Sequence, residues 1–217
     1  MDENEMKMTK EPEDPERLAR QLRFILEVDK EKNILRQTHL SGHGRREDDA
    51  EHAWHMALMC WLLREYANGP IDTGKTMLMC LVHDLVEIDA GDTYAYDEEG
   101  KKTQHTREEK AADRIFGLLP KDQADALRGL FEEFERDDTM EAHFAHAMDN
   151  FQPLLLNNAN GGADWKAHGV TRDQVNGRQY KTEAGSEVLF AKTKEILDAN
   201  EAAGCFRKES KEDEKRP

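Results

Sequence analysis

The residues best suited to chemistry stand in a strongly apolar stretch, "LMCLVHDLVEIDAGD", at residues 78–92. His83 and Asp84 adjoin inside it, and Glu87 follows at helical spacing. A buried carboxylate is very costly in free energy unless it is paired or binds a metal. An imidazole beside a carboxylate offers ligands that suit Zn, Mn, Fe, Co or Ni. The stretch therefore indicates either a metal site or a hydrogen-bonded pair within the core.

Two further carboxylates follow this pair. Glu87 comes three residues after Asp84 and four after His83, so on a helix all three side chains lie on the same side. A carboxylate in that position can orient a ligand or transfer a proton. Gly91 lets the chain turn, which directs Asp92 toward the same region. The pattern thus adds Glu87 and Asp92 to the predicted site.

Partner ligands are available on two other predicted helices. His52 and His55 stand at i, i+3 in "AEHAWHMALMCWLL", and "EAHFAHAMDNFQPLLL" contains His143, His146 and Asp149. Asp149 stands at the edge of an apolar helical stripe, where a lone Asp is more often exposed to solvent than bound to a metal. The residues alone leave open whether His52 or His55 is a ligand, and whether His143 and His146 bind metal.

Helical periodicity runs through the chain from residue 15 to residue 202. The first predicted helix carries Leu18, Leu22, Ile25 and Leu26 on one face, which we expect to pack into the core. Two polar segments, "RQTHLSGHGRREDDA" and "DTYAYDEEGKKTQHT", are predicted to be loops. With no period-2 strand pattern and no repeat, we predict an all-α fold, a single helical domain of about seven to eight helices.

The domain is expected to span residues 15–202, between charged, flexible tails at residues 1–14 and 203–217. The formal charge of -15, from 46 acidic and 31 basic residues, argues against a nucleic-acid polymer as partner. It leaves room for a small phosphorylated substrate in a local basic pocket. No apolar run approaches the ~20 residues that span a bilayer, and the start does not resemble a signal peptide, so we expect a cytoplasmic protein without a membrane partner. The three cysteines lack CxxC spacing, which predicts neither disulfides nor a thiolate zinc site.

Three segments taken in order, "EHAWHMA", "HDLVEIDAGD" and "AMDNFQPLL", resemble the HD-domain metal-dependent phosphohydrolase superfamily. The family pattern is a His on one helix, a His-Asp doublet on the next, and a distant Asp. Within the superfamily, the bacterial 5′-deoxynucleotidases and related short HD-domain hydrolases are the most similar, over residues 17–200. The resemblance implies an HD-type fold, a homodimer, and hydrolysis of a phosphomonoester, in particular a (deoxy)nucleoside 5′-monophosphate.

The resemblance also implies a ligand set. Its members are the four residues that match the family pattern, namely His52, His83, Asp84 and Asp149. Such a set holds one divalent transition metal, Mn, Co, Zn, Fe or Ni, with Mg²⁺ as an alternative. Water or phosphate fills the remaining positions of the metal.

Substrate residues follow from the same resemblance. Glu87 matches the catalytic carboxylate, Asp92 matches a residue that contacts substrate or the attacking water, and Arg36 matches an Arg that orients the phosphate. Arg46 is a further phosphate candidate, because Arg is well suited to phosphate. There is one departure: the deoxynucleotidases have a Trp after the Arg, where this chain has Gln37. The departure affects the nucleoside preference more than the phosphatase chemistry.

Three alternatives stay open at this point. HD-type helical cages also host hydrolases of other nucleotides and di-iron oxygenases, and two irons per chain would distinguish the latter. A second metal could use His105, His143 or His146. A non-enzymatic, metal-stabilised regulatory module is the third alternative, and it would close the metal fully with side chains. The substrate depends on residues 91–106 and 157–180, which carry no motif that can be interpreted physically.

Overall fold

Helices dominate the structure, a computed structural model that describes residues 15–92 and 98–208. The order of elements is α1 (Pro15–Val28), η1 (Asp29–Asn33), β1 (Leu35–His39), β2 (Arg46–Asp48), α2 (Asp49–Leu63), η2 (Arg64–Tyr66), α3 (Thr73–Val82), α4 (Glu87–Ala90), α5 (Glu98–Phe116), α6 (Lys121–Arg136), α7 (Met140–Ala159), α8 (Ala163–His168), α9 (Arg172–Arg178), α10 (Tyr180–Gly185) and α11 (Glu187–Ala202). The all-α prediction is confirmed. The helices outnumber the seven to eight expected because α4, α8, α9 and α10 are short pieces between chain reversals.

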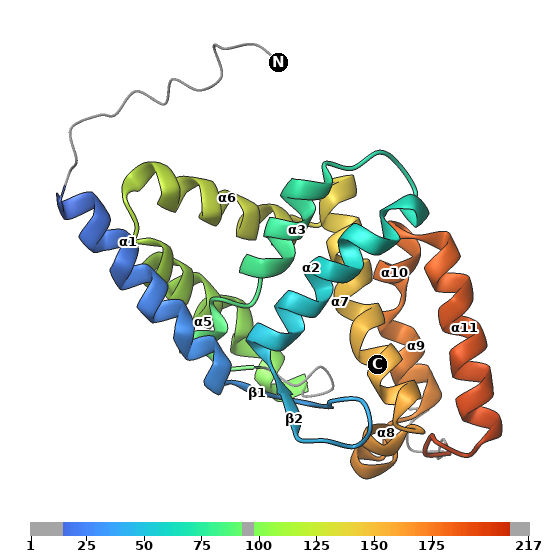
Figure 1. Cartoon of the computed structure of the whole chain (residues 1–217). Helices are drawn as coiled ribbons and strands as arrows, with labels where there is room; N and C mark the ends of the chain where they lie inside the picture. Colours follow the sequence, from blue (N-terminus) through green and yellow to red (C-terminus); the bar gives the residue numbers. More distant parts are fainter. Residues whose placement is uncertain (1–14, 93–97, 209–217) are drawn as a thin grey trace.

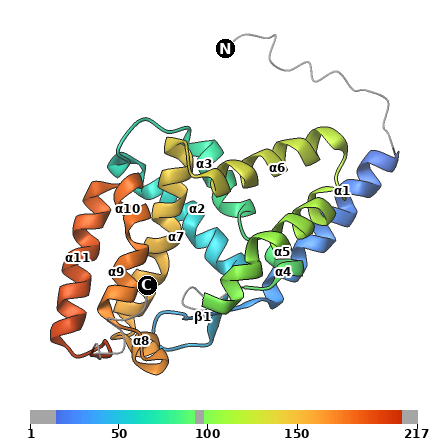
Figure 2. The same ribbon diagram turned by 180° about the vertical axis from the view of Figure 1, so that it is seen from behind.

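Helix α7 is the element around which the others are arranged (Figure 1). It packs against α2 and α3 on one side and against α10 and α11 on the other. The Thr139 side chain caps its first turn by accepting a hydrogen bond from the Ala142 amide. Seen from behind, α5 lies beside α1, and α6 extends from α3 and α7 toward them (Figure 2).

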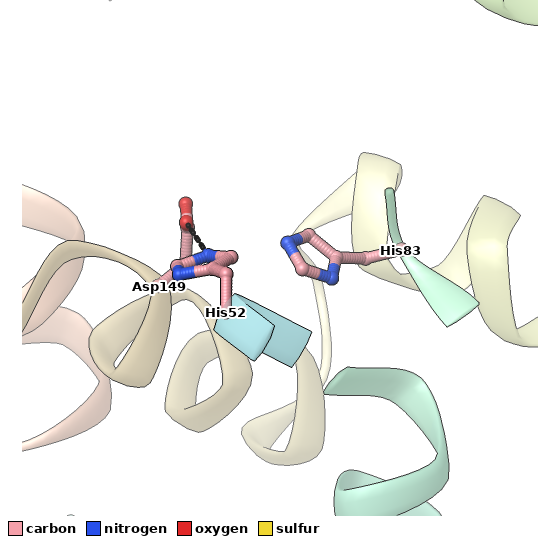
Figure 3. A group of neighbouring side chains, drawn as sticks. All are labelled: His52, His83 and Asp149. Carbon is pink, nitrogen blue, oxygen red and sulfur yellow. Dashed lines mark hydrogen bonds and ion pairs between the residues drawn. The ribbon is translucent and has the colours of Figure 1, made fainter. Parts of the chain in front are cut away.

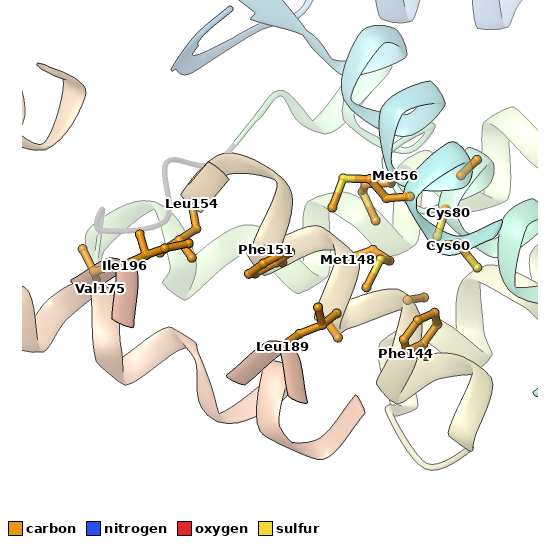
Figure 4. Close-up of a cluster of buried hydrophobic side chains, with 14 of the residues drawn as sticks. Met56, Cys60, Cys80, Phe144, Met148, Phe151, Leu154, Val175, Leu189 and Ile196 are labelled. Carbon is orange, nitrogen blue, oxygen red and sulfur yellow. The ribbon is translucent and has the colours of Figure 1, made fainter. Parts of the chain in front are cut away.

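Two apolar clusters fill the interior. The first, here called the α7 cluster, is built mainly from α2, α3, α7 and α11 and includes Met56, Phe144, Met148, Phe151 and Leu189 (Figure 4). The second, the α5 cluster, gathers residues of α1, α5 and α6 and includes Phe24, Ala112, Ile115, Phe116 and Phe131. The chain passes from one to the other at the end of α3: Met79 and Cys80 belong to the α7 cluster, and Val82, Leu85 and Val86 to the α5 cluster.

The predicted single helix through His83 is wrong. Helix α3 ends at Val82, and a turn over residues 83–86 leads into α4 at Glu87. The backbone there tightens to i→i+3 hydrogen bonds, such as Glu87 N to Asp84 O at 2.8 Å. The His83 side chain also forms a hydrogen bond with the Cys80 carbonyl, with 2.9 Å between His83 Nδ1 and Cys80 O. This side-chain bond competes with continued helix formation.

A two-stranded hairpin occupies the first segment that was predicted to be a loop. Strands β1 and β2 are antiparallel, with Leu35 opposite Asp48 and His39 opposite Arg46. The Asn160 side chain accepts hydrogen bonds from the Gly42 and His43 amides at 2.9 and 3.2 Å. The hairpin is thus held by hydrogen bonds to the end of α7 and not by a buried apolar face. Its strands therefore lack the alternation of apolar and polar residues that would have predicted them. The hairpin carries Arg36 toward the interior.

The second predicted loop is also partly wrong, because α5 begins at Glu98 and makes residues 98–106 helical. Residues 93–97 of that segment lie outside the described residues. The tail beyond Ala202 is packed at its start: Cys205 is buried, and the Phe206 ring lies 4.9 Å from that of Trp165. The predicted flexible tails at residues 1–14 and 209–217 lie outside the described residues. The domain boundaries stay a prediction.

Helix α1 turns its predicted core face outward. Leu18, Leu22, Ile25 and Leu26 are 57%, 51%, 58% and 73% exposed, and Phe24 is the buried residue of this helix. Helix α2 presents a similar exposed stripe, Trp54, Leu58, Trp61 and Leu62. Two amphipathic helices thus show apolar side chains to solvent in the isolated chain. Among residues 15–92 and 98–208, no helix combines the length and hydropathy that crossing a bilayer requires.

Candidate metal centre and active site

Three predicted ligands meet at the junction of α2, α3 and α7. One ligand atom each of His52, His83 and Asp149 lies within 4.8 Å of the others (Figure 3). His52 Nε2 is 3.2 Å from Asp149 Oδ1. The N-terminus of α2 sets the position of His52, because Asp48 and Glu51 form a capping box that begins the helix at Asp49.

Both imidazoles present the nitrogen that a metal requires. His83 Nδ1 donates to the Cys80 carbonyl at 2.9 Å, and His52 Nδ1 donates to Gln152 Oε1 at 3.0 Å. The Gln152 amide is oriented by Glu47, whose carboxylate accepts from Gln152 Nε2 at 2.5 Å. With Nδ1 as the donor, each Nε2 is the nitrogen that could bind a metal once it carries no proton. Hydrogen bonds of this kind orient the histidines of metal sites.

Asp84, the fourth predicted ligand, adjoins this group through His83. Its Oδ2 lies 3.1 Å from His83 Nε2 and 2.9 Å from Arg36 Nη1. His83 Nε2 is buried without a hydrogen bond of acceptable geometry in the described structure. A buried nitrogen without such a bond is costly, and it is a position that a cation would satisfy. Two imidazole nitrogens and two carboxylates suit a divalent transition metal. The residues therefore fit the metal that the sequence predicts.

The charges of the site are strongly coupled. Burial and the positive charge of Arg36 lower the pKa of His52 to about 4. Burial also disfavours charge on His83, but the carboxylate of Asp84 outweighs it and raises the pKa of His83 to about 9. Burial acts against charge on Asp149 as well, yet its bond to His52 holds the pKa of that carboxyl well below its usual range. A cation entering the site must displace the His83 proton, so metal binding weakens at low pH.

A second group of carboxylates adjoins the first. One oxygen each of Asp49, Asp84 and Glu87 lies within 4.8 Å of the others. Arg36 Nη1 joins two of them, at 3.1 Å from Asp49 Oδ1 and 2.9 Å from Asp84 Oδ2. Burial raises the pKa of Glu87 well above its ordinary value, and the nearby charges of Asp84 and Asp49 raise it further. Burial and the neighbouring charges therefore favour the uncharged form of Glu87 in the metal-free protein.

Sequence reasoning missed Asp49 and Gln152. Asp49 is fully buried, and burial followed by repulsion from Asp84 raises the pKa of its carboxyl to about 7. Acidic residues are common in the first turn of a helix, so the sequence gives Asp49 an ordinary explanation. Gln152 lies three residues after Asp149 on α7, and this helical spacing is the signal that could have found it.

A cavity of about 530 Å³ opens beside these groups. Its walls include six of the predicted site residues, namely Arg36, His83, Asp84, Glu87, Asp92 and Asp149, and also Gln37. Gly91 has a φ of 76°, which glycine adopts readily and which ends α4 before Asp92. Arg46 is exposed on β2 and is not among the described residues that line the cavity. His52 is buried behind the wall.

The remaining histidines lie apart from the metal ligands. His105 is exposed on α5. His143 Nδ1 lies 2.9 Å from Asp137 Oδ1, and His146 Nε2 donates to the Phe134 carbonyl at 2.9 Å. Within residues 15–92 and 98–208, no group of potential metal ligands contains any of the three. His55 contacts Gln152 through Nδ1 at 3.1 Å, so His52 is the one that reaches the ligand cluster.

This combination of fold and site defines the HD domain class. The chain matches the family described as HD domain over residues 28–189, which is most of its length. The chain belongs to the HD domain family, as the order of its motifs predicts. The described arrangement of His52, His83, Asp84 and Asp149 lies wholly inside the matched region.

Named relatives are 5′-deoxynucleotidases. Human 5′-deoxynucleotidase HDDC2 is 32% identical over 111 residues, which cover 51% of this chain and 53% of that protein. The 5′-deoxynucleotidase hdd1 of Schizosaccharomyces pombe is 29% identical over 119 residues, covering 52% of this chain and 58% of the relative. The chain thus spans about half the length of the curated relatives it matches.

Solved structures match over a larger part of the chain. A protein from Magnetospirillum magnetotacticum MS-1, described as a predicted metal-dependent phosphohydrolase, has a TM-score of 0.86 and 47% sequence identity, covering 91% of this chain and 99% of that one. A conserved hypothetical protein from Pyrococcus furiosus has a TM-score of 0.58 and 20% identity, covering 83% and 99%. The second likeness shows the fold alone.

Proposed function

We propose that this protein is a divalent-metal-dependent phosphohydrolase that acts on phosphomonoesters, with (deoxy)nucleoside 5′-monophosphates as its substrates. One observation carries the proposal. The donor set of His52, His83, Asp84 and Asp149 borders a cavity of about 530 Å³ and stands beside Glu87, a buried carboxyl that can transfer a proton. The similarity to 5′-deoxynucleotidases and to a protein described as a metal-dependent phosphohydrolase supports this choice of reaction.

His52, His83, Asp84 and Asp149 would hold the metal. When bound, a divalent ion supplies Lewis-acid chemistry, which offsets charge on a phosphoryl group and makes a nearby water more acidic. Gln152 and the Cys80 carbonyl keep the imidazoles in the required tautomer. The identity of the metal among Mn, Co, Zn, Fe, Ni and Mg is decided by experiment, because this mixed donor set suits several of them.

Glu87 and Asp49 handle the proton in this proposal. They are neighbouring buried carboxyls, and one oxygen of each lies within 4.8 Å of the other. Two such groups can hold one proton between them. Glu87 takes a proton from the attacking water or returns one to the leaving oxygen. Arg36 keeps the side chains of Asp49 and Asp84 close together by donating to both through Nη1. Asp92 contacts the sugar or the water from the cavity wall.

A phosphatase screen tests the proposal. Metal-free protein is reloaded singly with Mn, Co, Zn, Fe, Ni or Mg and incubated with nucleoside 5′-monophosphates, their 3′ isomers and the 2′-deoxy forms, while phosphate release is measured. We expect release from several 5′-monophosphates but not from the 3′ isomers. No release with any metal would contradict the proposal, and two irons per chain would favour the oxygenase alternative. A metal that exchanges no water would favour the regulatory alternative.

We also propose a homodimer. The exposed stripes of α1 and α2 give each copy apolar surface of the kind that is buried in subunit interfaces. Light scattering after size-exclusion chromatography should give twice the 25.0 kDa chain mass, and the double variant Leu22→Glu, Leu26→Glu should give one chain mass. A monomeric parent protein would contradict the dimer.

We further propose a cytoplasmic location, because Cys60, Cys80 and Cys205 are free thiols, as is usual in reducing compartments. Fractionation of cells that produce the protein, with blotting of the soluble and envelope fractions, tests this location.

A further inference from the structure

One wall of the cavity comes from the end of the segment, residues 157–180, on which the sequence analysis expects the substrate to depend. Five consecutive residues, Gly177 to Lys181, line the cavity where α9 passes into α10. Helix α10 packs against α7, which supplies the ligand Asp149. The buried Gln179 accepts a hydrogen bond from Thr182 Oγ1 at 2.8 Å. These contacts hold the segment in place beside the metal ligands.

The two basic residues of this segment differ in their partners. Lys181 Nζ is engaged, at 3.4 Å from Asp137 Oδ2 and 3.2 Å from His146 Nε2. Arg178 is half-buried, and in the part of the chain that the structure describes it makes no ion pair or hydrogen bond. Arg178 is therefore a cation on the cavity wall whose donors are available to a ligand.

Arg178 is also close to the reacting region. Burial raises the pKa of Asp92, and the positive charges of Arg36 and Arg178 oppose that rise. Arg178 likewise contributes to the low pKa of Asp149, although burial acts in the other direction and His52 is the stronger partner. An electrostatic influence on both carboxylates requires that the guanidinium lie near them, because the effect of a charge falls with distance.

The other cation of the site is already occupied. Arg36 Nη1 contacts Asp49 and Asp84, so its charge is balanced by two carboxylates. A phosphomonoester dianion in the cavity also faces Glu87 and Asp92. A positive charge that is not shared with a protein carboxylate would add to the charge of the metal in offsetting this repulsion. A guanidinium fits a phosphate through two parallel N–H donors.

We propose that Arg178 binds the phosphate group of the substrate from the α9–α10 wall of the cavity. The inference rests on the proposed function, which it extends by assigning the residue that recognises the dianion. Arg178 lies outside the helices that carry the HD-type ligands, so the charge that attracts the substrate and the residues that hold the metal come from different parts of the chain.

The experiment compares Arg178→Gln with Arg172→Gln. Both arginines are half-buried residues of α9, but Arg172 pairs with Asp198 and Glu201 and does not line the cavity. In Arg178→Gln we expect KM for a nucleoside 5′-monophosphate and the inhibition constant of inorganic phosphate to rise by about 10- to 100-fold, because a hydrogen bond to a charged group is lost. We expect kcat to change much less. Arg172→Gln should leave all three constants unchanged.

Two further measurements separate binding from folding. Metal content and melting temperature should be equal in the parent protein and Arg178→Gln, and Arg178→Lys should recover part of the phosphate affinity. Equal phosphate inhibition in the parent protein and Arg178→Gln would overturn the inference. If the parent protein hydrolyses no phosphomonoester, the proposed function fails, and calorimetric titration of the Mn²⁺-loaded proteins with inorganic phosphate tests Arg178 alone. Equal affinities there would again overturn its role.

Discussion

The metal site and the α7 cluster share one helix but differ in how their buried groups are satisfied. Phe144, Met148 and Phe151 extend from α7 into the apolar cluster, whereas Asp149 and Gln152 extend toward the site (Figures 3 and 4). In the described residues, the buried polar side-chain atoms without a hydrogen-bond partner concentrate in or beside the site: Glu31 Oε1, Glu47 Oε2, Asp49 Oδ2, His83 Nε2 and Glu87 Oε2.

The comparison teaches that the two regions make opposite contributions to stability. Each buried polar atom without a partner costs about 1–3 kcal/mol, while each fully buried large apolar side chain contributes about 1.5–3 kcal/mol. The α7 cluster thus stabilises the fold, whereas the unpartnered buried polar atoms of the metal-free site destabilise it. Sites that concentrate charge for function commonly do so at the expense of stability. Substitutions in the site should therefore mainly change activity. Substitutions in the α7 cluster should mainly change the free energy of unfolding.

The largest effect is expected at Glu87. Glu87→Gln keeps the shape of the side chain but removes the carboxyl that transfers a proton, so kcat should fall by about 10²- to 10⁴-fold. The variant should bind metal as the parent protein does, and its unfolding free energy should be equal or higher, because a buried carboxyl is lost. Phosphate release, metal analysis and urea unfolding measure the three quantities. Retained kcat in the metal-loaded variant would remove Glu87 from the mechanism.

The reverse outcome, a loss of stability with an unchanged kcat, is expected in the α7 cluster. Phe144 is fully buried in the α7 cluster, and Phe144→Ala should lower the unfolding free energy by about 3–5 kcal/mol through lost burial and a cavity. The kcat of the molecules that remain folded should be unchanged. Val188→Ala, at a residue that is 55% exposed, is the control and should change stability by less than about 0.5 kcal/mol. Comparable losses in the two variants would contradict the assignment of Phe144 to the core.

Gln152 lies between the two regions and should give an intermediate effect. Gln152→Leu keeps the volume of this fully buried residue but removes the partner of His52 Nδ1, so metal affinity should fall by about 10- to 100-fold. Competition with a fluorescent chelator measures that affinity. An unchanged metal affinity would show that the tautomer of His52 is set without Gln152.

The smallest effect is a dependence of stability on pH. Burial and repulsion from Asp84 raise the pKa of Glu31 to about 8, from 4.5 in the unfolded chain. The stability that comes from uncharged Glu31 is complete below pH 4.5 and is lost as pH rises through 8. In metal-free protein, Glu31→Gln should therefore raise the melting temperature by a few degrees at pH 9, with a smaller rise at pH 6. A difference that stays constant from pH 6 to pH 9 would exclude this ionisation.

Sequence reasoning found the parts of the site that follow local spacing. His83, Asp84 and Glu87 form one short motif, and His52 and Asp149 occur at apolar helix faces, so pattern and resemblance identified them together. Asp49 and Gln152 escaped because each has an ordinary local explanation, as a helix-start acid or a helix amide. Their roles arise from contacts between segments far apart in the chain, such as Gln152 with His52.

The fold was predictable to a similar extent. Helical periodicity marked the long helices, including α2, α6 and α7. The hairpin depends on Asn160, more than 100 residues away, and the break after Val82 depends on a side-chain bond to Cys80. Periodicity also placed the stripe of α1 on one face correctly but could not tell which side of that helix meets the rest of the chain. The sequence pattern predicts which residues share a face of a helix. Packing against the other elements decides whether that face is buried or exposed.

The passage of α3 between the two apolar clusters has a mechanical consequence. The chain leaves the α7 cluster at Cys80 and enters the α5 cluster at Val82, directly before the His83–Asp84 turn. His52 and Asp149 belong to helices of the α7 cluster, while His83 and Asp84 lie in the turn that leads from α3 into α4, which packs on α5. A cation bound by these four residues would cross-link the α7 cluster and the α5 cluster, which are otherwise joined by side-chain packing. Its presence should make the two halves unfold as a single unit.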